Sequence, residues 1–461
     1  MEELLNQIGQ AIVSISDLVC GVPEFLLLIG GGLFLFCYSG GVSIRRLPWS
    51  IRALRHKHAK AAGKEAGQIS SFQALMSSIA ATVGMGNIAG VAIALTVGGP
   101  GVIFWMWVSA LVGMSTKFFE GTLAIKFKGK DSHGEVQGGP MYVITNGLGA
   151  KWKPLAVAFS IFGLIGTLCF MQANQLVESV TTVFTTPAGI EDTTMLRFWM
   201  GVAITVIVGS VILGGIKRIA AVASRIVPIM VSLYLIFVVL IMVLNAGMLP
   251  TIFKEIFSQA FSMRAGFGGF TLIALTGARR AAMVNEAGVG TASMMHGASM
   301  NTEPVREGLV AMIAPALDSG LVCTLTSIPI LVAQNYVGLD AGQVQGLAIA
   351  LGAFGQLLPY GQYLLMVIVF FFAFSTMFSY SYYGQKCTSY LFGADKAKYY
   401  NYFYLVMIVV ACVTSLKVVV SLMDLAFALM ACCTMFTLIA LRKTVKQEMQ
   451  RYFSAQNGTE N

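Results

Sequence analysis

Long apolar runs alternate along the chain with short polar or basic stretches. Each run is close to the roughly 20 residues that a helix needs to cross ~30 Å of hydrocarbon. About eleven such runs lie near residues 21–43, 70–97, 99–127, 153–182, 197–215, 219–246, 267–298, 306–334, 361–393, 399–417 and 420–441. The pattern predicts an all-α polytopic membrane protein with about eleven transmembrane helices.

Charge between the runs predicts how the chain is inserted. Basic residues concentrate in the first loop, residues 44–66, and in the C-terminal segment, residues 442–461. Because basic loops stay in the cytoplasm, the C-terminus is expected inside and the N-terminus outside, which an odd number of spans allows. We therefore expect a multi-pass plasma-membrane protein, in a bacterium an inner-membrane protein, with the lipid bilayer around it.

Two of the runs carry the same polar interruption. Asn87–Val91 reads NIAGV and Asn285–Val289 reads NEAGV, in spans that run in opposite directions on this topology. Glycine costs a helix interior about 1 kcal/mol relative to alanine, and an unpaired peptide group in hydrocarbon costs several times more. Both spans are therefore expected to be broken helices, unless Gly86 and Gly90 serve only for close helix packing.

The positions of the two breaks predict the domain plan. They open two five-span repeats, about residues 67–250 and 264–441, which together form a transporter core. Residues 1–66 hold an interfacial segment, one extra span and the basic loop, and residues 442–461 form a cytoplasmic tail. Interrupted segments in two inverted halves point to a binding site, since freed amides suit a carboxylate and freed carbonyls suit Na⁺.

Charged residues inside the apolar runs are candidates for functional or structural roles. Glu286 adjoins the second break, where three roles are open: steadying unwound backbone, contributing to a cation site, or taking up a proton. Asp318 also lies deep and is expected to pair with Arg279 or Arg280. Two further charged residues are expected to form a snorkelling pair at the inner membrane surface: Lys117 and Glu120.

Neutral polar side chains in two spans suit a small ligand or ion. Ser375 and Thr376 offer adjacent hydroxyls for cation coordination, although such hydroxyls more often bond to their own helix. Gln172 and Asn174 either orient the charged groups of a ligand or tie two helices together. Four aromatic residues either cap a small ligand or form an interfacial belt: Phe378, Tyr380, Tyr382 and Tyr383.

Composition excludes several function classes. Hydrophobic residues make up 56% of the chain and charged residues 11%, against roughly 25% charged residues in soluble domains. The net charge of +9 is spread over loops instead of one soluble face, so no nucleic-acid partner is expected. The phosphate-binding loop, H-E-x-x-H and G-x-S-x-G motifs are absent from the sequence, and we expect no enzyme.

Several sequence blocks from the second span through the ninth point to one family. They are VGMGNIAGVA, GGPGVIFWMWVSALVGMSTKFFEGTLAIKF, GGPMYVI, MQAN, NEAGVGTASMMHGA, PVREGLVAM, VCTLT and SYYGQKCTSYLFG. These blocks resemble the alanine or glycine:cation symporters, also called sodium:alanine symporters. The resemblance implies a five-plus-five inverted-repeat fold, preceded here by one extra helix, that imports small amino acids, typically alanine or glycine, with co-transported Na⁺.

The resemblance also implies a site, residue by residue. It implies substrate contacts at the first break and in the fourth span, which are Thr82, Gly84, Gly86, Asn87 and Gln172. Two further candidates for substrate contact are Asn285 at the second break and Tyr380 in the ninth span. The expected sodium ligands are the carbonyls of Ala80 and Val83 and the hydroxyls of Ser375 and Thr376.

Three departures from the family pattern fall at this presumed site. The family often reads Gly-Thr-Gly-Asn where this chain has Met85 in second place, and Phe-Ser-Asn-Glu where it begins Met283-Val284. It often reads Gly-Trp where this chain has Ser379-Tyr380. The fold and sodium coupling are still expected, but the substrate is open to a somewhat different neutral amino acid.

The expected function is therefore a sodium-coupled symporter that imports a small neutral amino acid by alternating access. One alternative is the same fold driven by protons through Glu286. Another is a passive channel or a non-transporting membrane subunit. Uptake with Na⁺ replaced by K⁺ at fixed pH separates the first two, and uphill accumulation separates both from the third.

Overall fold

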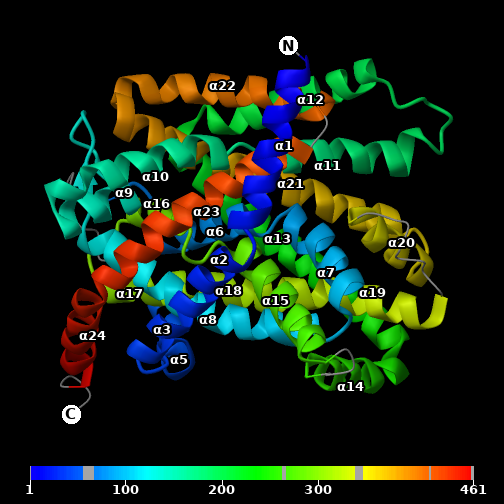
Figure 1. Cartoon of the computed structure of the whole chain (residues 1–461), viewed down its shortest axis with the longest axis horizontal. Helices are drawn as coiled ribbons and strands as arrows, with labels where there is room; N and C mark the ends of the chain where they lie inside the picture. The colour runs from blue at the N-terminus through cyan, green and yellow to red at the C-terminus, as the bar shows by residue number, and fades with distance from the viewer. Residues whose placement is uncertain (1, 56–66, 262–265, 338–345, 415–416, 458–461) are drawn as a thin grey trace.

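The chain is almost entirely helical in the computed structural model, which describes residues 2–55, 67–261, 266–337, 346–414 and 417–457. Most long helices run in one direction across the view, and the helix labelled α23 crosses them obliquely (Figure 1). The strands in the described part are the short antiparallel pair β1 (Gly129–Lys130) and β2 (Val136–Gln137). Helices satisfy their own backbone hydrogen bonds, which hydrocarbon requires.

The N-terminal segment is a series of helices that covers the core. Its elements are α1 (Glu2–Val19), α2 (Val22–Phe25), η1 (Leu26–Gly30), α3 (Gly31–Tyr38), α4 (Val42–Arg45) and α5 (Leu47–Arg55). Gly41 has φ 72°, a left-handed backbone that favours glycine and turns the chain between α3 and α4. α1 packs on α23 (Lys417–Ala440), and α3 packs on α8 (Val102–Lys126).

The first half of the core contains the first break. Its further elements are α6 (Ser71–Thr82), η2 (Gly86–Gly90), α7 (Val91–Gly98), α9 (Pro140–Val143), η3 (Ile144–Leu148), η4 (Ala150–Trp152), α10 (Lys153–Gly166), α11 (Phe170–Val180), η5 (Thr181–Thr185), α12 (Thr194–Ile212), α13 (Gly215–Leu244), η6 (Ala246–Met248) and α14 (Leu249–Ala260). α6 begins with a capping box, in which Ser70 and Gln73 exchange side chain to backbone hydrogen bonds.

The second half contains the second break. Its elements before α23 are α15 (Gly266–Asn285), α16 (Thr291–Gly297), α17 (Pro304–Ala311), α18 (Ile313–Pro315), η7 (Ala316–Val322), α19 (Cys323–Val337), α20 (Leu347–Leu357), α21 (Gly361–Phe392) and α22 (Ala394–Val413). α24 (Arg442–Asn457) follows α23 at the C-terminal end. α8 lies among both halves, because α15, α16, α17 and η7 all pack against it.

Seven described helices are long and apolar enough to cross a membrane, and the bent pair α6 and η2–α7 makes an eighth if counted as one span. The seven are Val102–Lys126, Ala150–Thr185, Thr194–Ile212, Gly215–Leu244, Pro304–Ala333, Gly361–Phe392 and Val419–Ala440. The other expected spans coincide with α2–α3, α15–α16 and α22. The chain is an all-α polytopic membrane protein, and the number eleven stays a prediction.

The two broken spans meet at one end. Ile69, just before α6, pairs with Ser299, just after α16, in a parallel bridge. The Gln68 N–H donates to the Ala298 carbonyl at 2.8 Å, and the Met300 N–H donates to the Ile69 carbonyl at 2.7 Å. These backbone hydrogen bonds close one end of the core, and the breaks lie deeper inside it.

Candidate functional site

The first break separates α6 from η2–α7, which are bent by 54° to each other. Val83 has an extended backbone (φ −78°, ψ 94°) and ends α6. Asn87 closes the gap, because its Oδ1 accepts from the Gly84 N–H at 2.9 Å and its own N–H donates to the Gly84 carbonyl at 3.0 Å. A fully buried side chain thus replaces the helical partners that the break removes.

The second break separates α15 from α16 and has left-handed backbone at Glu286 (φ 51°), Gly288 (φ 94°) and Gly290 (φ 96°). Glycine adopts such angles freely, whereas a residue with a side chain is strained by about 1–3 kcal/mol. Glu286 is held there by two donors: the Tyr380 hydroxyl bonds to its Oε1, and the Thr291 hydroxyl bonds to its Oε2 at 2.5 Å. These two hydrogen bonds fit the steadying role among the three that are open for Glu286.

Three other side chains fix the second break. The Gly288 N–H donates to Glu120 Oε1 at 2.6 Å, which joins the break to α8. The Thr434 hydroxyl donates to the Val289 carbonyl at 3.0 Å, which joins it to α23. Asn285 Oδ1 accepts from the Ala287 N–H at 2.9 Å within the turn. Hydrogen bonds from α8, α21 and α23 thus hold this break on three sides.

Thr376 brings α21 to the end of α6. Its Oγ1 lies 3.1 Å from the Ala80 carbonyl and 3.0 Å from the Phe372 carbonyl of its own helix. Ser375 Oγ lies 3.1 Å from the same Phe372 carbonyl, which is the own-helix alternative for this hydroxyl. Of the expected sodium ligands, the structure joins Thr376 and Ala80 directly, and it buries Ser375 and Val83 beside them.

The glycines of the first break have different neighbours. A Cβ added to Gly84 would lie 2.6 Å from Thr376 Oγ1, and one added to Gly90 would lie 2.2 Å from Arg280 Nε. A Cβ added to Gly86 would lie 3.6 Å from Val284, an ordinary contact. Gly84 is thus required for the approach to Thr376, whereas Gly90 makes room for α15 and so fits the packing alternative.

Gln172 and Asn174 of α11 differ in what they contact. Asn174 Nδ2 donates to the Ala411 carbonyl at 3.0 Å and to the Thr414 carbonyl at 3.1 Å, so Asn174 ties α11 to the end of α22. Gln172 is 9% exposed, and its Oε1 has no hydrogen-bond partner among the residues that the structure describes. Gln172 Oε1 is thus an unpaired acceptor among the described residues, whereas Asn174 ties two helices together.

The remaining expected substrate residues are also buried. Thr82 Oγ1 lies 3.4 Å from the Ile79 carbonyl of its own helix. Asn285 Nδ2 has no hydrogen-bond partner within the described ranges. The aromatic group of α21 is buried in the core, which corrects the interfacial-belt alternative: Phe378, Tyr380, Tyr382 and Tyr383.

Two expectations about charged residues are wrong. Lys117 and Glu120 are 0% exposed and so do not form a surface pair. Helices α16 and α17 pack against α8, and the sequence gives no sign of this packing. Neither carboxylate oxygen of Asp318 has a hydrogen-bond partner among the described residues, so Asp318 pairs with neither Arg279 nor Arg280 there. Arg280 lies against Gly90 instead.

A buried cluster around Glu307 of α17 was not predicted from the sequence. Glu307 Oε1 bonds to His296 Nδ1 at 2.7 Å, and its Oε2 accepts from Ser71 Oγ at 2.5 Å and Asn301 Nδ2 at 2.9 Å. These contacts join the start of α6 to the end of α16. A carboxylate and a histidine close to span ends were the only available signal, and their separation in sequence hid the contact.

Lys128 extends this junction from the loop after α8. Its Nζ donates to the Ser299 carbonyl at 2.6 Å and to the Asn301 carbonyl at 3.1 Å. Burial lowers the pKa of Lys128 to about 8. The cationic form is therefore disfavoured by burial but still donates to two carbonyls.

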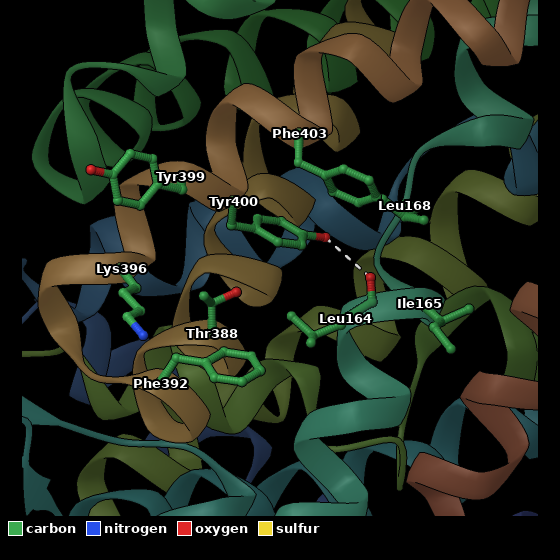
Figure 2. A pocket seen from close by; sticks show the side chains of 9 residues that line it. All are labelled: Leu164, Ile165, Leu168, Thr388, Phe392, Lys396, Tyr399, Tyr400 and Phe403. Carbon is green, nitrogen blue, oxygen red and sulfur yellow. Dashed lines mark hydrogen bonds between the residues drawn. The ribbon is translucent and has the colours of Figure 1, made fainter.

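A cavity of about 500 Å³ lies away from both breaks, between α10, α21 and α22 (Figure 2). The Tyr400 hydroxyl donates across it to the Leu164 carbonyl at 3.3 Å (Figure 2). Its lining is mostly apolar and aromatic and includes none of the expected substrate or sodium residues. An amino-acid zwitterion would lose its hydration there without matching partners, so this cavity is not the candidate site.

Neutral oxygen donors meet at the first break. The carbonyl oxygen of Ala80 and the hydroxyl oxygen of Thr376 are hard ligands of the kind that suit Na⁺. Within the described ranges, no group of three His, Cys, Asp or Glu residues is placed to hold a metal ion.

Comparisons with known proteins agree with this geometry. The chain is similar in structure to the crystal structure of MhsT in complex with L-phenylalanine, with a TM-score of 0.51 over 82% of this chain and 89% of that one, at 13% identity. It is 35% identical over 447 residues to the sodium/alanine symporter AgcS of Methanococcus maripaludis, covering 95% of this chain and 96% of that protein.

A second relative, the probable sodium/glutamine symporter GlnT of Bacillus subtilis, is 31% identical over 454 residues, covering 97% of this chain and 91% of GlnT. The profile of the sodium:alanine symporter family matches residues 5–461. The fold, the paired breaks and these matches agree: this chain belongs to the sodium:alanine symporter family.

Proposed function

We propose that this chain imports a small neutral amino acid together with Na⁺ by alternating access, and that both bind between the two breaks. Members of the family are transporters, so the chain is a symporter and not an enzyme. The observation that carries the proposal is the contact of Thr376 with the Ala80 carbonyl beside Gly84, at the first break. That contact places a hydroxyl and a carbonyl oxygen where backbone is freed.

The sodium position follows from these donors. The Ala80 and Val83 carbonyls and the Ser375 and Thr376 hydroxyls form the proposed ligand set. In the structure Thr376 lies within hydrogen-bond distance of Ala80. A sodium ion inserted there would replace that contact by coordination from both oxygens, with α6 and α21 as its two walls.

The substrate position follows from the unpaired polar groups. Gln172 Oε1 and Asn285 Nδ2 supply an acceptor and a donor without described partners, and the amide of Gly84 lies at the break. The full proposed contact set is Thr82, Gly84, Gly86, Asn87, Gln172, Asn285 and Tyr380. The names of two relatives, an alanine and a probable glutamine symporter, support a neutral amino acid.

The orientation and the repeat plan belong to the proposal. Basic loops support an outside N-terminus and a cytoplasmic C-terminus in the plasma membrane. The similarity to MhsT supports the inverted repeats at about 67–250 and 264–441, preceded by the extra segment 1–66 and followed by the tail 442–461.

Uptake into proteoliposomes tests the proposal. Labelled alanine, glycine, glutamine and other neutral amino acids are supplied under an inward Na⁺ gradient, with a matched set in which K⁺ replaces Na⁺ at fixed pH. We expect accumulation above the external concentration only with Na⁺. Accumulation driven by a pH gradient without Na⁺ would favour the proton-coupled alternative, and equilibration without accumulation would favour a passive channel.

A further inference from the structure

A group of buried charged and polar residues lies beside the substrate site, and of its members only Asn285 has a part in the proposed function. α8 supplies Lys117 and Glu120, the second break supplies Asn285 and Glu286, and η7 supplies Asp318. All five are at most 3% exposed. We call this group the polar pocket. The three carboxylates all lie near enough to Lys117 for its charge to act on them.

The charges of the polar pocket do not balance. Three carboxylates, Glu120, Glu286 and Asp318, surround the single ammonium of Lys117, and Lys117 Nζ makes no hydrogen bond with described residues. Uncompensated charge is costly in a buried environment and is normally neutralised by a proton, a partner or a bound ion. With every group ionised, the pocket would carry an excess of negative charge, which attracts a cation.

Hydrogen bonds show which carboxylate is open. Both oxygens of Glu286 accept hydroxyl donors, from Tyr380 and Thr291. Glu120 Oε1 accepts the Gly288 amide, and its Oε2 has no partner among the described residues. Neither oxygen of Asp318 has a hydrogen-bond partner in the part of the chain that the structure describes. Asp318 is therefore the carboxylate with the most unused capacity for a ligand.

The surroundings of Asp318 suit a small cation. The hydroxyls of Thr82 and Ser319 lie near its carboxylate, and each donates to a backbone carbonyl, of Ile79 and of Ala281, which leaves their oxygens able to bind an ion. The other titratable groups near it are Lys117 and the Cys323 thiol. Hydroxyl and carboxylate oxygens are the ligands that hard cations prefer, and a single carboxylate matches a single positive charge.

Asp318 also touches the first break. Asn87 Nδ2 lies 3.5 Å from the Asp318 carbonyl, and Asn87 Oδ1 holds the Gly84 amide. This contact joins the backbone of Asp318 to the first broken span. A cation at Asp318 can therefore be coupled to the same movement that binds and releases the substrate.

We propose that Asp318 binds a second monovalent cation, a proton or a sodium ion, at a position separate from the Thr376 site. The proposal rests on the proposed function and deepens it, because transport then couples two cations to each amino acid. Thr82 and Ser319 supply further oxygen ligands when the ion is sodium. When it is a proton, the proton resides on an Asp318 carboxylate oxygen and returns to water as the pocket opens.

Counting bound cations on the full-length purified protein tests the proposal. Equilibrium binding of ²²Na⁺ at fixed pH gives the sodium count, and a pH indicator in weakly buffered solution gives the protons exchanged when Na⁺ and alanine are added. We expect two cations per chain for the wild type, either two sodium ions or one sodium ion and one proton. Asp318→Asn should lose one, and Thr376→Ala should lose the other.

Glu24→Gln is the matched control, because Glu24 is a buried carboxylate of α2 outside the polar pocket. It should keep both cations. The Hill coefficient of sodium-dependent uptake should approach about 2 for the two-sodium case and about 1 after Asp318→Asn, since it cannot exceed the number of sites. An Asp318→Asn protein that binds as many cations as the wild type would overturn the proposal.

The wild type alone also decides the matter if Asp318→Asn fails to fold. A wild type that binds one sodium ion and exchanges no proton contradicts the second position, even when sodium-driven uptake is intact. Failure of the proposed function looks different, because no amino acid then accumulates under a sodium gradient. The two failures are therefore distinguishable in one set of preparations.

Discussion

The two breaks are built differently although they share the pattern N-x-A-G-V. The first is closed by the two hydrogen bonds between Asn87 and Gly84. Its ties to other elements are long contacts of Asn87 Nδ2, 3.5 Å to the Asp318 carbonyl and 3.7 Å to Cys323 Sγ, and the Thr376 contact with the Ala80 carbonyl at the proposed sodium position. The second is tied outward by shorter hydrogen bonds, by Glu120 to Gly288, by Tyr380 to Glu286, and by Thr434 to Val289. The same sequence signal thus marks one break with weak or exchangeable outside ties and one that is anchored to three helices.

Because of this difference, we expect the two breaks to have different roles in transport. A break with weak or exchangeable outside ties can change its bend and exchange its own hydrogen bonds for those of a ligand at small cost. A break with three buried anchors stays in place, since moving it leaves buried donors and acceptors unpaired. We infer that the first break binds and moves, and that the second serves as the fixed wall against which it closes.

Removing an anchor of the second break should have the largest effect on stability. Glu286→Ala leaves the Tyr380 and Thr291 hydroxyls buried without an acceptor, at a cost of about 1–3 kcal/mol each. Thermal unfolding of the purified protein measures this loss. Glu178→Ala changes an exposed carboxylate of α11 and should stay within about 0.5 kcal/mol. Equal stability of the two variants would show that the second break is not anchored by Glu286.

Adding a methyl group at the first break should change the sodium dependence of uptake more than the stability of the protein. Gly84→Ala puts a methyl group 2.6 Å from Thr376 Oγ1, whereas Gly86→Ala puts one 3.6 Å from Val284. We expect Gly84→Ala to raise the half-saturating sodium concentration for uptake about tenfold, equivalent to about 1.4 kcal/mol. Gly86→Ala is the matched control for sodium dependence. A larger sodium effect from Gly86→Ala would argue against the Thr376 site.

Substitutions of the neighbours Gln172 and Asn174 should have different effects, one on amino-acid affinity and the other on stability. Gln172→Ala removes an acceptor that is unpaired in the described structure, so it should weaken amino-acid affinity about tenfold and leave unfolding unchanged. Asn174→Ala removes the donor to two carbonyls of α22 and its end, so it should lower stability by about 1–2 kcal/mol and leave affinity unchanged. Uptake titrations and thermal unfolding of both variants check this, and identical profiles would contradict it.

Lys128, at the junction of the two broken spans, should have a smaller effect on stability, which depends on pH. The pKa of Lys128 falls from 10.5 in the unfolded chain to about 8 in the folded protein. Between these values the unfolded state binds more protons, so the contribution of Lys128 to the free energy of unfolding rises with pH. The free energy of unfolding of the wild type, relative to that of Lys128→Met, should therefore rise between about pH 8 and about pH 10. A constant difference would contradict the lowered pKa.

Features that depend on local composition could be predicted from the sequence. Glycines beside Asn87 and Asn285 inside apolar runs predict breaks, because no uninterrupted helix favours them there. The family resemblance predicted Thr376 beside Ala80, and the structure brings them together. These predictions succeed because each rests on a few adjacent residues or on a specific motif.

Features that depend on how the helices pack against one another could not be predicted from the sequence. Lys117 and Glu120 look like a surface pair when depth is counted along one span, but neighbouring helices cover both. The hydrogen bond from Tyr380 to Glu286 joins residues 94 positions apart. Only the three-dimensional packing shows that the second break is anchored and that Asp318 is left open.

The most direct test of the account is equilibrium binding of the amino acid that wild type accumulates, measured with and without Na⁺ on purified wild type and Asn87→Ala. Asn87→Ala removes the acceptor of the Gly84 amide at the first break. The account predicts sodium-dependent binding to the wild type and its loss in a folded Asn87→Ala protein. Equal, sodium-dependent binding to both would show that the first break is not where the substrate binds.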